Sequence, residues 1–216
     1  MNSFKSILFD LDGTLIDSLG SVSDSIKIVL MKAGYRTDID SRKLIGPPIR
    51  EIFSSILPEL NEKMINDLIV AYRKEYDSEG WKNTKLFDHV PMVLDDLHSL
   101  RKLYCYLVTN KPHTPTSNIL KLFNIAKYFE DAVSPDTFPG VGISKSELVS
   151  ELIQKHNIDV SESVFVGDSK LDAKAAYENK ICFVAISYGY GSAHLQNRYP
   201  RFGIISNISE IFNFVR

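Results

Sequence analysis

The fold of this chain is decided by the stretch Ile7-Leu8-Phe9-Asp10-Leu11-Asp12-Gly13-Thr14-Leu15. A short apolar run ends at Asp10, and a second carboxylate, Asp12, follows after one residue. A run this short and continuous is typical of a buried strand. Two carboxylates at its end are costly to remove from water unless cations hold them, and ligands bind at that end of strands in open α/β sheets. An Asp-Gly turn alone needs only one acid, so the pair favours a functional site.

Length and composition indicate an ordinary globular protein. The chain has 216 residues, of which 44% are hydrophobic and 24% charged, a balance that allows a buried core. Its net charge of -2 lacks the basic excess of nucleic-acid-binding proteins. No apolar run approaches the roughly 20 residues that a membrane-spanning helix needs. We therefore expect neither nucleic acid nor a membrane as a partner.

The two cysteines, Cys105 and Cys182, each lie in an apolar, strand-like run. Such positions favour buried free thiols over a disulfide or a metal pair. Near the N-terminus, Asp10 and Asp12 interrupt what would be the apolar segment of a signal peptide. These features predict a reducing, cytoplasmic location.

Residues 17–83 show almost no strand signal, and we expect them to form a helical domain inserted after the first strand. Apolar residues recur there at helical spacing in three segments, 22–30, 49–57 and 64–76. A short helix is also expected over residues 40–44, before the rigid break Gly46-Pro47-Pro48.

Strand-like and helix-like patterns alternate through the rest of the chain. Strands are expected at residues 5–9, 104–108, 131–134, 163–166, 181–186 and 202–205, and helices at 92–100, 114–123, 144–155, 172–178 and 208–215. Such alternation is typical of a parallel sheet with helices on both faces. We predict an α/β, Rossmann-like core of three layers, formed by residues 1–16 and 84–216, with the helical bundle of residues 17–83 inserted into it.

Polar side chains follow three predicted strands at the point where each strand ends. They are Asp10 and Asp12, Thr109 and Asn110, and Asp168 with Asp172, while Lys145 begins a helix between the last two strands. Because such strand ends converge on one crevice, four carboxylates would face one lysine. That excess of negative charge predicts a bound cation, and oxygen ligands without His or Cys favour Mg2+. The hydroxyl, amide and ammonium groups suit a phosphate.

These motifs resemble those of the haloacid dehalogenase (HAD) superfamily of phosphotransferases. The matching segments are, in chain order, Asp10-Leu11-Asp12-Gly13-Thr14, Val108-Thr109-Asn110, Lys145, and Gly167-Asp168-Ser169 with Asp172. The helical insert resembles the α-helical cap of the phosphoglycolate phosphatase-like subgroup. Two further segments resemble that subgroup, Gly46-Pro47-Pro48-Ile49-Arg50 in the insert and Thr109-Asn110-Lys111-Pro112 in the core.

The resemblance implies a Mg2+-dependent phosphatase that acts through an aspartyl-phosphate. Asp10 would be the nucleophile, and Asp12 would act as general acid and then as general base. The metal would bind the side chains of Asp10 and Asp168 and the backbone carbonyl of Asp12. The inserted helices would close over the site and exclude water during the first step.

The resemblance also implies how the phosphate is held. Thr109, Asn110 and Lys145 would bind it directly. Asp172 and Thr14 would not touch the phosphate but would contact the groups that bind it. Asp172 would orient either a water molecule or the lysine.

Three positions carry weaker signals. Lys145 is followed by Ser146, where the family often has proline. Lys111 is therefore a second candidate for binding the phosphate. Its position just past the second motif, however, predicts a residue at the rim of the site. Arg50 in the insert would either reach an anionic leaving group or be a solvated arginine at a helix start. His113 lies near the expected phosphate rim, and the histidines show no metal-ligand spacing.

Other reactions compete with hydrolysis of a phosphate ester. A sugar-phosphate mutase of the β-phosphoglucomutase type would use Arg50 to hold a second phosphate. A dehalogenase would lack the second acid, Asp12, and a phosphonate hydrolase needs a cap lysine that the sequence does not identify. A phospho-acceptor signalling receiver is one small domain and needs neither Asp12 nor an insert. We therefore expect a phosphatase of small phosphorylated metabolites, either a monomer or a homodimer.

Overall fold

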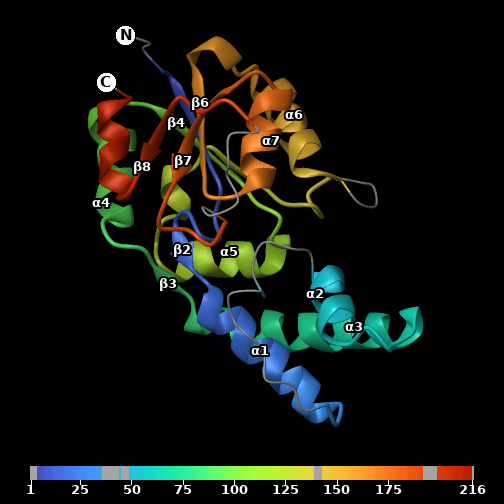
Figure 1. Cartoon of the computed structure of the whole chain (residues 1–216). Coiled ribbons are helices and arrows are strands. Elements are labelled where there is room, and N and C mark those ends of the chain that lie inside the picture. The colour runs from blue at the N-terminus through green and yellow to red at the C-terminus, as the bar shows by residue number, and fades with distance from the viewer. Residues whose placement is uncertain (1–3, 36–43, 45–48, 139–142, 192–198, 216) are drawn as a thin grey trace. The chain divides into compact units, whose positions relative to one another are not determined.

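The computed structural model describes residues 4–35, 44, 49–138, 143–191 and 199–215 (Figure 1). The chain divides into two compact units. We call residues 1–16 with 86–216 the core unit, and residues 17–85 the helical unit. Two short strands, β2 (Ile16–Asp17) and β3 (Lys85–Leu86), pair where the chain passes from one unit to the other.

The core unit is built on a six-stranded sheet with the strand order β5-β4-β1-β6-β7-β8. Its strands are β1 (Ser6–Phe9), β4 (Tyr104–Val108), β5 (Asp131–Val133), β6 (Ser163–Gly167), β7 (Cys182–Ile186) and β8 (Gly203–Ile205). All neighbouring strands pair in parallel. Every residue of β1 is buried, which explains why Ile7, Leu8 and Phe9 form a continuous apolar run rather than an alternating pattern. The predicted α/β, Rossmann-like core is confirmed.

Helices cover both faces of this sheet. The α-helices of the core unit are α4 (Val90–Asp95), α5 (His113–Leu122), α6 (Lys145–His156) and α7 (Lys170–Glu178). In Figure 1, α6 and α7 lie on one side of the sheet and α4 lies on the other. Fully buried side chains such as Leu8, Leu148 and Phe165 form the apolar core between the sheet and the pair α6 and α7.

Two predicted helices differ in type from the expected α-helix. The helix expected over 92–100 is α4 followed by a π-helical turn, Asp96–Leu100. The helix expected over 208–215 is a 3-10 helix, Ile208–Asn213. Its buried residues, Ile208 and Ile211, are three apart, and that spacing matches the three residues per turn of a 3-10 helix.

The helical unit contains α1 (Leu19–Lys32), α2 (Ile49–Ile56) and α3 (Glu62–Ser78). Side chains from all three helices, including Ile26, Phe53 and Leu68, form its apolar core. The predicted break at 46–48, and all of the predicted helix 40–44 except Leu44, lie outside the described residues. Among the described helices, none combines the length and the apolar character needed to cross a bilayer.

Both cysteines are free thiols, as predicted. Cys105 is buried in β4, and burial raises the pKa of its thiol to about 12, so it stays protonated and unreactive. Cys182 at the start of β7 is only half-buried. Its side chain is therefore more exposed than we predicted from the apolar residues around it in the sequence.

Candidate active site

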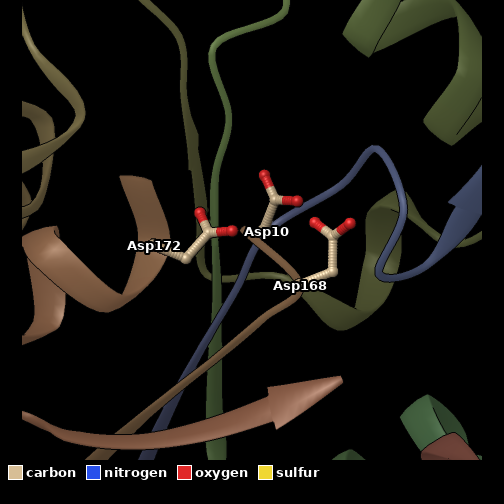
Figure 2. Close-up of side chains that lie close together, drawn as sticks. All are labelled: Asp10, Asp168 and Asp172. Atoms are coloured by element: carbon tan, nitrogen blue, oxygen red, sulfur yellow. The ribbon is translucent and has the colours of Figure 1, made fainter. Parts of the chain in front are cut away.

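The central strands β4, β1 and β6 deliver functional side chains to one edge of the sheet. Phe9 at the end of β1 lies opposite Leu107 of β4 and Val166 of β6, so the residues that follow these strands emerge together. Carboxylate oxygens of Asp10, Asp168 and Asp172 all lie within 4.8 Å of one another. Figure 2 shows the three side chains gathered at this edge.

A buried lysine lies among these carboxylates. The Nζ atom of Lys145 contacts Oδ1 of Asp10 and lies 2.5 Å from Oδ1 of Asp172. Lys145 is the first residue of α6, because Ser144 and Glu147 form a capping box that begins the helix there. The cap thus determines the point at which the lysine enters the site.

The site carries more negative charge than the lysine can neutralise. Burial, followed by the carboxylate of Asp172, raises the pKa of Asp10 and raises that of Asp168 to about 7. Burial alone would lower the pKa of Lys145, but Asp10 and Asp172 outweigh it and raise that pKa. The ammonium is therefore charged beside three buried carboxylates. Such a set of oxygen ligands fits a divalent cation.

Both oxygens of Asp172 are already engaged. Oδ1 pairs with Lys145, and Oδ2 accepts hydrogen bonds from the backbone N–H of Ser169 at 2.9 Å and from its hydroxyl at 2.6 Å. These bonds close the first turn of α7 and hold the carboxylate behind the lysine. The arrangement suits a residue that positions Lys145 rather than one that binds a metal.

The loop after β7 holds the third carboxylate, Asp168. The backbone N–H of Gly191 donates to Oδ2 of Asp168 at 2.8 Å, and the hydroxyl of Tyr188 donates to the carbonyl of Thr14 at 2.7 Å. A Cβ atom on Gly189 would lie 2.2 Å from the Cβ of Asp168, so this close approach requires glycine. In the sequence, the two glycines of this loop permitted a close approach to the site, but they fitted a plain flexible loop at least as well, so the sequence did not decide between the two.

A tight turn keeps the second acid of the opening stretch beside the first. Gly13 has a φ of +85°, a conformation that favours glycine, and its N–H donates to the carbonyl of Ile16 at 2.9 Å. The hydroxyl of Thr14 donates to Oδ2 of Asp10 at 3.2 Å. A Cβ atom on Gly13 would lie 2.5 Å from Oδ2 of Asp168. The turn therefore brings the backbone at Gly13 close to the Asp168 carboxylate and the Thr14 hydroxyl onto Asp10.

The segment after β4 contributes Thr109 and Lys111, which are buried, and Asn110, which is exposed. The N–H of Lys111 donates to Oγ1 of Thr109 at 3.0 Å, a local turn that reverses the chain. The Nζ atom of Lys111 thereby lies 3.1 Å from Oδ1 of Asp12. The prediction that Lys111 lies at the rim is wrong, because only 6% of its side chain is exposed. The prediction that a single lysine faces the carboxylates is also wrong, because Lys111 is a second lysine and pairs with Asp12.

Arg50 and His113 are placed differently from the residues above. Arg50 belongs to the helical unit, where it is exposed and its guanidinium donates a hydrogen bond to Oδ1 of Asn66 on α3. His113 is the exposed first residue of α5, and its backbone N–H donates to Oδ1 of Asp136 at 2.8 Å. Each of these two residues thus bonds to a partner within its own unit.

Comparisons with known proteins connect this geometry to a family. A family model described as haloacid dehalogenase-like hydrolase matches residues 7–186. A phosphoglycolate phosphatase of Vibrio cholerae is 30% identical over 213 residues, which are 94% of this chain and 93% of that protein. A 5'-nucleotidase of Pseudomonas aeruginosa is 27% identical over 196 residues, covering 88% of this chain and 85% of that protein.

A solved structure shares the whole fold. A putative phosphatase from Clostridium difficile matches with a TM-score of 0.88 and 26% identity over 100% of both chains. The family model covers Asp10, Thr109, Lys145 and Asp168 together, so the resemblance noted in the sequence is confirmed. The chain belongs to the haloacid dehalogenase-like hydrolase family, and within that family it is a phosphatase that hydrolyses phosphoric monoesters.

Proposed function

We propose that this phosphatase depends on Mg2+, acts on small phosphorylated metabolites and forms an aspartyl-phosphate on Asp10. The observation that carries the proposal is the buried contact between the Asp10 carboxylate and the Lys145 ammonium, beside Asp168. A carboxylate can attack a phosphoryl group only where positive charge offsets the negative charge of both. Lys145 supplies a fixed positive charge next to the attacking oxygen.

The metal would bind the side chains of Asp10 and Asp168 and the backbone carbonyl of Asp12. When bound, Mg2+ would neutralise charge on the phosphoryl oxygens and on the two carboxylates. We leave Asp172 out of this ligand set, because its Oδ1 pairs with Lys145 and its Oδ2 accepts two hydrogen bonds from Ser169 at 2.9 and 2.6 Å. Oδ2 of Asp10, by contrast, accepts a longer bond of 3.2 Å from Thr14. This choice is supported by the raised pKa values of Asp10 and Asp168, whose burial leaves them in need of a cation.

The reaction would proceed in two half-reactions. In the first, an oxygen of Asp10 bonds to phosphorus, the bond from phosphorus to the leaving oxygen breaks, and Asp12 gives that oxygen a proton. In the second, Asp12 takes a proton from water, and the water oxygen displaces Asp10 from phosphorus. The products are an alcohol and inorganic phosphate, and both carboxylates return to their starting state.

Donors around Asp10 would hold the transferring phosphate in place. We assign this role to Lys145, to the Thr109 hydroxyl and to the Asn110 amide, with Thr14 supporting the Asp10 carboxylate through its hydrogen bond. Because the Thr109 oxygen already accepts the Lys111 N–H, its own hydroxyl proton can point toward a phosphate oxygen. Positioned donors of this kind stabilise charge that develops in the transition state.

The helical unit is proposed to act as a cap that excludes water during the first half-reaction. Its chain is inserted just after the turn that carries Asp12 and Gly13. Within it, Arg50 would contact an anionic part of the leaving group. The named activities of the relatives make phosphoglycolate and 5'-nucleotides the first esters to test. The two free thiols support a cytoplasmic location.

A panel of phosphate esters tests the function. The purified protein is incubated with phosphoglycolate, sugar phosphates and 5'-nucleotides, with Mg2+ or with EDTA, and released phosphate is measured. We expect release from at least one ester with Mg2+ and none with EDTA. Absence of release from every ester in Mg2+ would refute the proposal. An isomerised sugar phosphate without release would identify a mutase instead.

Mg2+ is also expected to stabilise the folded protein, and Asp168→Asn is expected to remove most of that effect. A ligand present at 100 times its Kd raises the free energy of unfolding by about 2.7 kcal/mol. The measurement is urea denaturation in Mg2+ and in EDTA. Asp12→Asn is the matched control, because it keeps the backbone carbonyl and should retain the stabilisation. Equal stabilisation of Asp168→Asn and the unaltered chain would contradict the assigned ligands.

A further inference from the structure

The reaction as proposed assigns no task to Lys111, although this residue lies inside the site. Its side chain is 6% exposed, and its Nζ atom lies 3.1 Å from Oδ1 of Asp12. Lysine is almost never this buried unless it is paired, because removing an ammonium from water carries a large free-energy cost. The contact with Asp12 offsets that cost.

We propose that Lys111 is a positioning residue for Asp12. Its ammonium holds the Asp12 carboxylate in the orientation from which Asp12 gives a proton to the leaving oxygen and later takes one from water. The inference rests on the proposed function, since Asp12 is the acid and base of that reaction. Lys111 would be the residue that determines the orientation of the Asp12 carboxylate.

The backbone of Lys111 is anchored on both sides, which makes it a suitable support. Its N–H donates to Oγ1 of Thr109 at 3.0 Å, and its carbonyl lies 3.4 Å from the hydroxyl of Thr116 in α5. Thr109 directly follows β4 and is itself buried. The ammonium is therefore held relative to the sheet, and not by a flexible surface segment.

Asp12 is the more exposed of the two acids in the opening stretch. Its side chain is 23% exposed, whereas Asp10 is almost fully buried and contacts both Lys145 and Thr14. A half-exposed carboxylate on a turn can adopt several rotamers, and proton transfer requires a donor at hydrogen-bond distance from the reacting oxygen. Pairing with the buried ammonium of Lys111 limits this freedom.

The two buried lysines thus serve different acids. Lys145 enters from α6 and pairs with Asp10 and Asp172, while Lys111 enters from the segment between β4 and α5 and pairs with Asp12. Removal of Lys111 should therefore impair proton transfer and leave the charge beside the nucleophile in place. This difference can be measured with substrates whose leaving groups need a proton to different degrees.

The test compares Lys111→Met with the unaltered chain on two esters. Methionine keeps most of the length of the side chain and removes its charge. With an alkyl phosphate, whose leaving oxygen must be protonated, we expect kcat/KM, which reports the first half-reaction, to fall on the order of 30-fold, below the range for complete loss of general acid catalysis. With p-nitrophenyl phosphate, whose leaving group is a stable anion, we expect a decrease of about 3-fold. Lys121→Met, at an exposed lysine in α5, is the matched control.

A double-mutant cycle shows whether Lys111 acts through Asp12. In the Asp12→Asn background, Lys111→Met is expected to change kcat/KM for the alkyl phosphate by less than about 3-fold, because residues that act as one unit are not additive. A crystal structure of Lys111→Met gives a readout that does not depend on activity. It should show the Asp12 carboxylate in a changed or multiple orientation. Lys111→Gln replaces the methionine variant if the latter does not fold.

Three outcomes would overturn the inference. One is an equal loss of kcat/KM with both esters, and another is a raised KM with unchanged kcat, which would make Lys111 a substrate ligand. The third is an unchanged Asp12 orientation in the variant. Failure of the proposed function is distinguishable, because the unaltered chain would then release no phosphate from any ester. The orientation of Asp12 would still decide the positioning role.

Discussion

Replacing Asp10 by asparagine is expected to lower kcat by at least about 10^4-fold, the order of loss seen when a nucleophile is removed. The amide is a poor nucleophile and cannot form the acyl phosphate. The variant should fold, because asparagine has the same shape, its oxygen can accept from Lys145, and its NH2 group can donate to the Thr14 hydroxyl. Its stability in EDTA should match or exceed that of the unaltered chain, since burial makes ionised Asp10 unfavourable.

The measurement combines steady-state kinetics, urea denaturation and mass spectrometry of the acid-quenched reaction. A phosphorylated species should be trapped with the unaltered chain and be absent from Asp10→Asn. Asp95→Asn, at an exposed aspartate of α4, controls for the loss of one carboxylate. Near-normal turnover by Asp10→Asn would show that another residue is the nucleophile.

The second large effect concerns stability. Lys145→Met should lower the free energy of unfolding in EDTA by about 3–5 kcal/mol, the cost of removing one partner from a buried ion pair. The reason is that Asp10 and Asp172 would then remain buried without their shared cation. Activity should be lost as well, because the charge beside the attacking oxygen is gone.

A compensating substitution separates the two effects. Adding Asp172→Asn to Lys145→Met removes one unpaired carboxylate and keeps an acceptor for Ser169, so roughly half of the lost stability should return. Turnover should not return. Lys174→Met, at an exposed lysine of α7, is the control for removing a lysine. A loss of stability no larger than in this control would show that the buried pair is energetically unimportant.

The sheet and its acidic edge were predictable because local sequence determines them. Apolar runs that stop at Asp10 and Asp168 indicate buried strands, and parallel strands must place the residues after them at one edge. The start of α6 was predictable for a similar reason, since Ser144 is a residue that caps helices. In each case the signal lies within a few residues of the feature.

The remaining features depend on contacts between distant segments. The burial of Lys111 follows from a turn that points it toward Asp12, and neither residue reveals the other in the sequence. The support of Asp168 by Gly191 joins the ends of β6 and β7. At the start of α1, Ser18 makes no side-chain capping bond, and the carboxylate of Asp17 accepts the Leu19 N–H. Both residues are good caps, so their order could not be decided from sequence.

The position of β1 has a consequence for how the protein is made. This strand is the first in the chain, yet it lies in the interior of the sheet, between β4 and β6. Its pairing with β6 requires Ser163 and the residues after it, so most of the polypeptide must leave the ribosome before Asp10 acquires its surroundings. The chain is synthesised from its N-terminus in seconds to tens of seconds. During that time the nascent protein carries Asp10, the proposed nucleophile, without the residues that surround it in the folded site.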